Sequence, residues 1–360
     1  MPAGVTELGF DIFSRCGSLA SVTFAEGTPE IAGGLFMDCT ALTKVQLPGS
    51  AARIEREAFS GCTALTDILL PEGVRHIGER AFAGCTALAA ITLPDSLVDI
   101  SRAAFDDTAF FNTPGNWTEN ALYLGNHLLA VRALSAEEFS IREGTKSIAA
   151  EVFQSQGALR RVHIPAEVAG IGAYAFSNCV ALAAIELPES LTFIGDGAFS
   201  GCTGLTQLTV PAGVTEVAPC LCRDCTALTA VDLPYGIACI GFDAFAGCSA
   251  LPEIVIPPCV TAIETGAFQG CTGFTEFVLP AATTAIGDKA LADCAALENV
   301  FILNHHIVFT DAVLNSGIPG QSAPAVVLHA DPDSPVCDWC IHHSFNYNPL
   351  GKGYEAPLEQ

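Results

Sequence analysis

Apolar positions recur along the chain with a period of 23 residues, and cysteine marks that period most clearly. Cysteine lies at positions 16, 39, 62 and 85, and again at 179, 202, 225, 248, 271 and 294. Thr108 and Gln156 occupy the cysteine position in two further repeats, and an apolar pair still precedes each of them. A last repeat, with a weaker match, has Gly317 at this position. A fixed period of this length is typical of a solenoid. We count about fourteen units in one frame.

Each unit predicts the same short elements. Apolar residues six and eight positions after the cysteine, such as Ile68 and Leu70, predict a short strand with one buried face. Proline at the ninth position ends that strand, because proline lacks the donor of the ladder. A second apolar pair follows, such as Val74 and Ile77, and the Ala-Phe pair before the next cysteine predicts a short helical or 3₁₀ turn. A unit this small can bury its apolar face only by stacking, so we predict a single solenoid domain over residues 1–360.

One unit, near residues 109–133, departs from the pattern and carries two extra residues. It contains ALYLGNHLLAV, in which Gly125-Asn126 joins two apolar runs. Gly-Asn between two such runs favours a two-residue turn, so we predict a β-hairpin. The hairpin is either a structural variant of the unit or a protruding contact.

The repeat resembles a known family. The unit CTALTDILLPEGVRHIGERAFAG, residues 62–84, is similar to the BspA-type, or Treponema-type, leucine-rich repeat, and the resemblance runs from Pro2 to about Leu303. It implies an α/β repeat solenoid, a right-handed coil with a parallel β-sheet on the concave side and short strands or helical turns on the convex side. Residues 304–360 form an irregular unit that resembles the strand-plus-helix cap of such arrays. A cap is needed because the last coil would otherwise expose its apolar face.

Composition and charge exclude several function classes. Half of the residues are apolar and 15% are charged. The chain contains 15 Lys and Arg and 39 Asp and Glu, which gives a net charge of −24. This balance disfavours nucleic acid as a partner, because nucleic-acid recognition depends on basic patches. No apolar run approaches the roughly 20 residues of a membrane helix, so we expect no membrane insertion. The first residues show no signal peptide.

The ten periodic cysteines occupy one equivalent place in successive coils. Their side chains should project in parallel, which suits disulfide geometry poorly, so we predict small buried thiols. Cys220, Cys222 and Cys225 are spaced like metal ligands. In the repeat frame, however, Cys225 is the periodic cysteine and Cys222 takes the phenylalanine position. The frame therefore favours core thiols over a metal site here.

A second cysteine group lies in the predicted cap. Cys337 and Cys340 form a C-x-x-C pair that His342 and His343 follow closely. We predict structural thiols, because no βαβ pattern precedes the pair. A disulfide and a zinc site with the two histidines are the alternatives.

The sequence lacks the common catalytic motifs. It contains no nucleophile elbow, H-E-x-x-H helix, P-loop or Gly-rich dinucleotide turn. Its carboxylates are spread over repeat positions that should face solvent. We therefore expect no enzymatic activity and no cofactor.

Two columns of side chains should point outward from the predicted sheet. They lie five and seven positions after each cysteine, because side chains alternate across a strand. The predicted binding residues on this face are Glu186, Asp232, Glu253, Val255, Glu276, Val278 and Phe301. Val255, Val278 and Phe301 should form an exposed apolar strip, which either contacts a protein partner of some basic character or is covered by the cap.

The resemblance implies a cell-surface or secreted bacterial protein that binds a host, matrix or other protein through its concave face. A structural spacer that displays other domains is the alternative. The chain starts inside a repeat, at PAGVTEL, so we expect an upstream strand to be missing. A cytoplasmic location is the alternative to the surface, because numerous reduced cysteines suit a reducing compartment.

Overall fold

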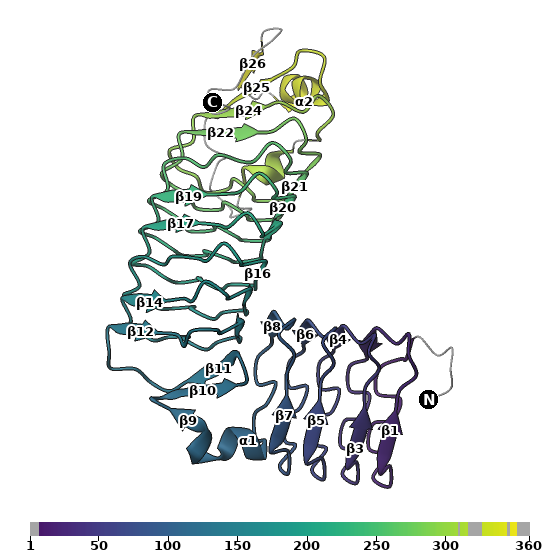
Figure 1. The fold of residues 1–360 in the computed structure, drawn as a ribbon. Helices are drawn as coiled ribbons and strands as arrows, with labels where there is room; N and C mark the ends of the chain where they lie inside the picture. Colours follow the sequence, from purple (N-terminus) through teal and green to yellow (C-terminus); the bar gives the residue numbers. More distant parts are fainter. Residues whose placement is uncertain (1–6, 309, 316–325, 344–345, 351–360) are drawn as a thin grey trace. The chain divides into compact units, whose positions relative to one another are not determined.

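The computed structural model describes residues 7–308, 310–315, 326–343 and 346–350 (Figure 1). The first six residues of the chain, where the expected truncated repeat begins, and the expected last repeat position Gly317 lie outside these residues. The chain divides into two compact units, which are described separately. Unit 1 comprises Met1–Leu134, Ile141–Phe153 and Pro165–Ala175, and unit 2 comprises Ser135–Ser140, Gln154–Ile164 and Phe176–Gln360. The single domain over residues 1–360 stays a prediction.

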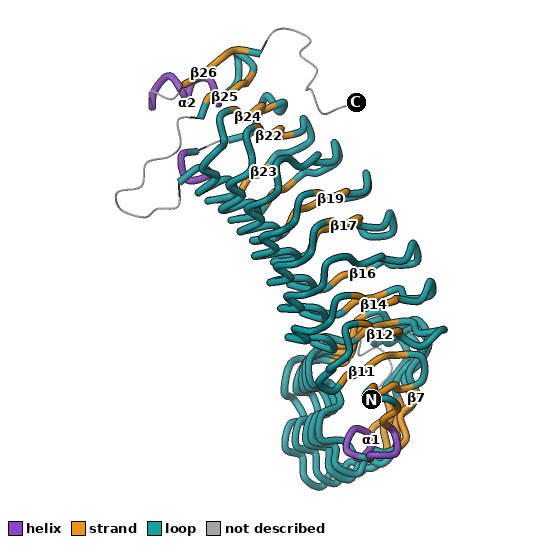
Figure 2. The backbone as a smooth tube through the Cα atoms, turned by 90° about the vertical axis from the view of Figure 1, so that its left-hand side faces the viewer, coloured by secondary structure: helices purple, strands orange, loops and turns teal. Residues whose placement is uncertain are grey.

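A typical coil contains a three-residue strand, a proline turn, a two-residue strand and a second turn. In the coil that holds Asp67–Leu69, Ile68 and Leu70 are 3% and 2% exposed, whereas Leu69 is 67% exposed. After the strand, the backbone N–H of Val74 donates to the carbonyl of Pro71 at 3.0 Å. The burial confirms the predicted alternation. The role of the proline in ending the strand stays a prediction, because the strand Ser21–Thr23 ends at the same repeat position although Ala25 replaces the proline. Figure 2 shows that strands are short segments of coils made mostly of turns.

Unit 1 stacks its strands in parallel pairs. Its three-residue strands are β1 (Ser21–Thr23), β3 (Lys44–Gln46), β5 (Asp67–Leu69) and β7 (Ala90–Thr92). Its two-residue strands are β2 (Glu30–Ile31), β4 (Arg53–Ile54), β6 (His76–Ile77), β8 (Asp99–Ile100), β13 (Ser147–Ile148) and β15 (Gly170–Ile171). The order β2-β4-β6-β8 is continuous, whereas the three-residue strands pair only as β1-β3 and β5-β7 among the described residues.

Unit 2 continues the same construction. Its three-residue or four-residue strands are β12 (Glu138–Ser140), β14 (Arg161–His163), β17 (Gln207–Thr209), β19 (Ala230–Asp232), β22 (Glu276–Leu279) and β24 (Asn299–Ile302). Its two-residue strands are β16 (Phe193–Ile194), β18 (Glu216–Val217), β20 (Cys239–Ile240), β21 (Ala262–Ile263) and β23 (Ala285–Ile286). Each described pairing between these strands is parallel, for example β17 with β19 and β22 with β24.

The irregular unit forms the predicted hairpin. Strands β10 (Ala121–Leu124) and β11 (His127–Val131) pair antiparallel around Gly125-Asn126, which confirms the prediction. Before them lie α1 (Ala109–Asn112), η1 (Pro114–Asn116) and β9 (Trp117–Thr118). Thr108 replaces the periodic cysteine here and caps α1, because its Oγ1 accepts a hydrogen bond from the N–H of Phe111 at 3.1 Å.

The Ala-Phe segments are turns that hydrogen-bond to the next coil. The N–H groups of Phe36, Phe59 and Phe82 each donate at 2.8 Å to a carbonyl 22 residues further along the chain. Local turns accompany these bonds, since the N–H groups of Ser60 and Cys62 donate to the carbonyls of Glu57 and Phe59, three residues earlier, at 3.1 and 3.2 Å. The predicted turns are therefore present, but these segments are not helices. Each of the two compact units is a solenoid of stacked coils with parallel strands and little helix. The α/β description of the fold is not confirmed.

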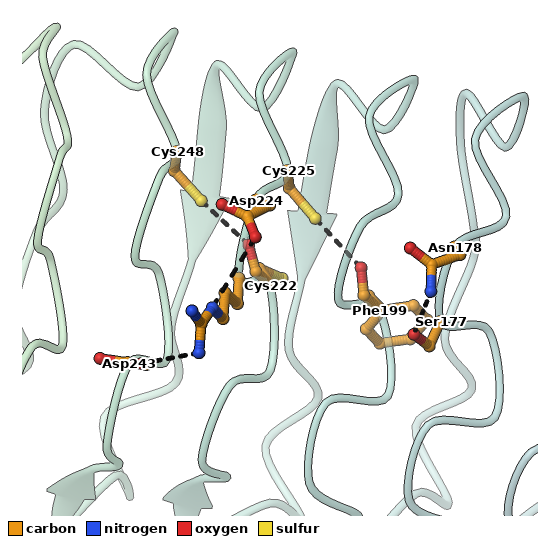
Figure 3. A network of polar contacts seen from close by, with 9 residues as sticks. Ser177, Asn178, Phe199, Cys222, Asp224, Cys225, Asp243 and Cys248 are labelled. Atoms are coloured by element: carbon orange, nitrogen blue, oxygen red, sulfur yellow. Dashed lines mark hydrogen bonds and ion pairs between the residues drawn. The ribbon is translucent and has the colours of Figure 1, made fainter.

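Buried cysteine and phenylalanine columns fill the coils. Cys225 Sγ donates to the carbonyl of Phe199, and Cys248 Sγ to that of Cys222, both at 3.1 Å (Figure 3). The cysteines are free thiols, and the periodic ones from Cys39 onward are buried, as predicted. Cys16 is the exception: it is exposed, because no described coil covers its side of the first coil.

The C-terminal segment holds η2 (Asp311–Val313), β25 (Val327–Ala330), α2 (Pro335–His343) and β26 (Asn346–Pro349). Strands β25 and β26 extend the sheet in the order β22-β24-β25-β26. The predicted cap region therefore contains a strand followed by a helix. Among the described residues, no helix is long and apolar enough to cross a membrane.

Candidate functional site

The strand face of unit 2 carries the predicted binding residues. We define it as the outward side chains of β14, β17, β19, β22 and β24 and of the segments 184–186 and 253–255 between them. Its ladder is interrupted, because neither segment forms a strand. In the second segment the cause is Pro252, which lacks the N–H that Thr229, at the same repeat position, donates to the carbonyl of Thr206 at 2.9 Å.

A groove of about 650 Å³ lies on this face and brings two predicted residues together. It is lined by residues 184–187, Glu189, Thr206, Gln207, 209–212 and 232–234. Its charged lining consists of the carboxylates of Glu186, Glu189 and Asp232. We call it the acidic groove. Thr209 lies at the same repeat position as Glu186 and Asp232, in the coil between them. Its Oγ1 donates to Oδ2 of Asp232 at 3.1 Å.

A smaller hollow of about 240 Å³ adjoins the groove at Glu186. It is lined by Arg161, Val162, His163, Ile164, Ala184 and Glu186. Glu186 therefore stands between an acidic groove and a hollow that contains a guanidinium group.

The predicted apolar strip is only partly exposed. Val255 is 51% exposed and Val278 is half-buried, but Phe301 is 8% exposed. The ring of His329 in β25 stacks on Phe301 with the centroids 4.4 Å apart, and its Nε2 lies 2.9 Å from Oδ1 of Asn299. Phe301 is therefore not exposed, because β25 covers it, which is the alternative in which the cap covers the strip. This desolvation also lowers the pKa of His329, against the opposing charge of Glu276.

Glu253 and Glu276 are exposed on the strand face but do not line the acidic groove. They belong to later coils of unit 2. The structure thus brings Glu186 and Asp232 together and leaves the remaining predicted residues along the same face.

Two residues at the groove were not among those predicted from the sequence. Glu189 lines it, and Tyr235, which is 82% exposed, directly follows the lining residue Pro234. Both come immediately after the periodic proline, in the turn that follows the strand. This turn projects beside the outward columns, so the proline position was the signal that could have identified them.

The cysteine groups do not form a described metal centre. Among the described residues, no group of three or more His, Cys, Asp or Glu side chains is arranged to hold a metal ion. Cys337 and Cys340 are buried free thiols in α2, and burial raises the pKa of Cys340 to about 11. The side chains of His342 and His343 lie outside the described residues, so the zinc alternative stays untested.

The repeat itself decides the family. Residues 1–111, 130–248 and 215–317 match the BspA type leucine rich repeat region, in 6 copies. The chain belongs to this family. Its BspA-type repeats therefore span the coils that carry the acidic groove.

Solved leucine-rich repeat structures are similar to this BspA-type chain. One from Bacteroides ovatus is 21% identical and covers 96% of this chain and 87% of its own, with a TM-score of 0.44. A leucine rich cell surface protein from Faecalibacterium prausnitzii is 24% identical over 82% of each chain, with a TM-score of 0.35. A leucine-rich repeat protein from T. pallidum is 29% identical over 58% of this chain and 75% of its own, with a TM-score of 0.27. No curated protein matches the chain significantly.

Proposed function

We propose that the chain is a non-enzymatic protein-recognition or adhesion module of a bacterial cell-surface or secreted leucine-rich repeat protein. It binds a host, matrix or other protein through the strand face of unit 2, which corresponds to the concave face of the sequence-based prediction. The observation that carries the proposal is the acidic groove. It places Glu186 and Asp232 in one exposed depression on a regular scaffold.

The construction of the coils supports a recognition role. Stacked coils hold outward side chains at a fixed spacing, while the cysteine and phenylalanine columns keep the interior packed. A face of this kind offers an extended surface with little loss of side-chain freedom on binding. Charge at its rim would speed association and select among partners.

A capture experiment tests the proposal. The purified chain is immobilised and exposed to extracellular-matrix and host-cell extracts, and retained proteins are identified by mass spectrometry. The variant Glu186→Lys/Asp232→Lys reverses both groove charges. We expect it to lose proteins that the unaltered chain retains, with an unchanged melting transition.

A matched control separates the groove from overall charge. Glu216→Lys/Asp288→Lys makes the same change in net charge at exposed positions of unit 2 that do not line the groove. This variant should retain the same proteins. If the groove variant also retains them, the strand face is not the binding surface and the spacer role is favoured.

A further inference from the structure

Glu186 and Asp232 occupy equivalent positions in coils that are 46 residues apart, with Thr209 at the same position between them. Thr209 is in register with Asp232 across β17 and β19. Because neighbouring strands lie about 4.8 Å apart, two coil spacings of this size place the backbones of the two residues roughly 10 Å apart along the unit. The acidic groove therefore presents negative charge at a defined interval.

Charge in and around the groove favours a basic occupant. Unit 2 contains 5 Lys and Arg against 21 Asp and Glu, and none of the groove-lining residues is Lys or Arg. Arg161 lies beyond Glu186, in the adjoining hollow. A cationic segment is thus attracted to the stretch from Glu186 to Asp232.

The Asp232 end of the groove adds apolar contacts. Pro211 and Pro234 line it, and the exposed Tyr235 follows Pro234 directly. Val255, in the next coil, is half-exposed on the same face. Tyrosine beside a rigid proline wall is the kind of anchor that contributes strongly to binding extended peptides.

We propose that the acidic groove binds an extended polyproline II segment of a partner protein with Lys or Arg at every third position. This conformation rises about 3.1 Å per residue with three residues per turn, so every third side chain points the same way about 9.3 Å further along. That interval matches the spacing of Glu186 and Asp232. A β-strand presents same-side residues about 6.8 Å apart, which does not match.

The inference rests on the proposed function and names the chemistry of the partner. A fluorescein-labelled peptide of four Lys-Pro-Pro triplets is titrated with the full chain, and binding is followed by fluorescence anisotropy at low salt. We expect saturable binding that weakens as salt is added, because salt screens exposed charges. A peptide of the same composition with its lysines at alternate positions should bind at least about tenfold more weakly, since no two of its lysines are three residues apart.

Matched variants locate the peptide. Glu186→Gln/Asp232→Asn should raise Kd at least about tenfold, and Tyr235→Ala should raise it about fivefold. The control Glu216→Gln/Asp288→Asn, which removes the same net charge outside the groove, should leave Kd within about twofold. Equal weakening by the control shows that net charge alone attracts the peptide, and overturns the inference.

The two proposals fail separately. Absence of peptide binding, or equal binding of the peptide with alternate lysines, overturns the polyproline II inference alone if the Glu186→Lys/Asp232→Lys chain still loses its captured proteins. If that chain keeps them, the strand face itself is excluded as the binding surface.

Discussion

Nδ1 of His127 lies 2.8 Å from Oγ of Ser147, and Nε2 of the same ring lies 3.1 Å from the carbonyl oxygen of Pro94. A carbonyl oxygen can only accept, so Nε2 carries the proton and Nδ1 accepts from the Ser147 hydroxyl. His127 is fully buried in β11. The neutral ring therefore ties the hairpin of unit 1 to two neighbouring segments.

This buried ring makes the stability of unit 1 depend on pH. Burial lowers the pKa of His127 to about 4, outweighing the opposing Pro94 carbonyl and Asp95, and Lys146 lowers it further. The unfolded chain binds the proton near pH 6.5, so the free energy of unfolding falls as pH drops from 6.5 to 4, by up to about 3 kcal/mol. Urea unfolding at a series of pH values measures this loss.

The variant His127→Gln isolates the effect. Burial raises the pKa of Asp106 and Glu151 in the same unit, so their folded forms bind protons more readily and stabilise the unit as pH falls. These groups are unchanged in the variant. We expect the difference between the two chains to shrink as pH drops from 6.5 to 4, and a difference that is constant with pH contradicts the assignment.

The phenylalanine column predicts a large packing effect. Phe82 is fully buried and stacks between Phe59 and Phe105, with 5.4 Å between ring centroids on each side. Phe82→Ala should lower the free energy of unfolding of unit 1 by about 3–5 kcal/mol. Leu69→Ala removes an exposed side chain of the same unit and should cost less than about 1 kcal/mol. Similar losses in urea unfolding would show that the column is not packed as described.

Thiol accessibility tests the cysteine columns. Cys16 and Cys259 are exposed, two cysteines are half-buried, and twelve are buried. Burial raises the pKa of Cys179 and Cys294 to about 12, so the thiolate, which is the reactive form, is scarce at pH 8. An aromatic disulfide reagent at pH 8 should modify two thiols rapidly, and all sixteen only in urea. Cys16→Ser/Cys259→Ser should remove the rapid phase, and its persistence would place other thiols at the surface.

Local and periodic features could be predicted from the sequence. The inward positions, such as Ile68, depend on residues within one repeat, and the same positions are buried in successive coils. The hairpin at Gly125-Asn126 follows from its own turn residues. The outward position of Glu186 and Asp232 follows from the same alternation.

Features that depend on contacts between distant segments could not be predicted in this way. Burial of Phe301 requires knowing that β25 pairs beside β24 and brings His329 over the ring. The acidic groove is lined by residues of three successive coils, and the shape they form together is not specified within any one repeat. The Ala-Phe segments are turns and not helices because alternate N–H groups bond to the next coil, and no propensity within the segment shows this.

A further feature of the repeat is a left-handed residue directly before the periodic cysteine. Gly84 has a φ of 72° there, and Asp38 and Asn178 have φ values of 58° in their coils. Glycine, aspartate and asparagine tolerate this conformation better than other residues. The frequent Gly-Cys, Asp-Cys and Asn-Cys pairs in the sequence are therefore a backbone requirement of the coil.

Substitution of Gly84 measures that requirement. A Cβ at this position would lie 3.7 Å from Gly61 Cα, so Gly84→Ala causes no clash and its cost is backbone strain of about 1–2 kcal/mol. Gly84→Asn should cost less, because asparagine adopts the left-handed region more readily. Gly115→Ala, at an open position without positive φ, should change stability by less than about 0.5 kcal/mol. Equal costs for Ala and Asn in urea unfolding would contradict a left-handed conformation at Gly84.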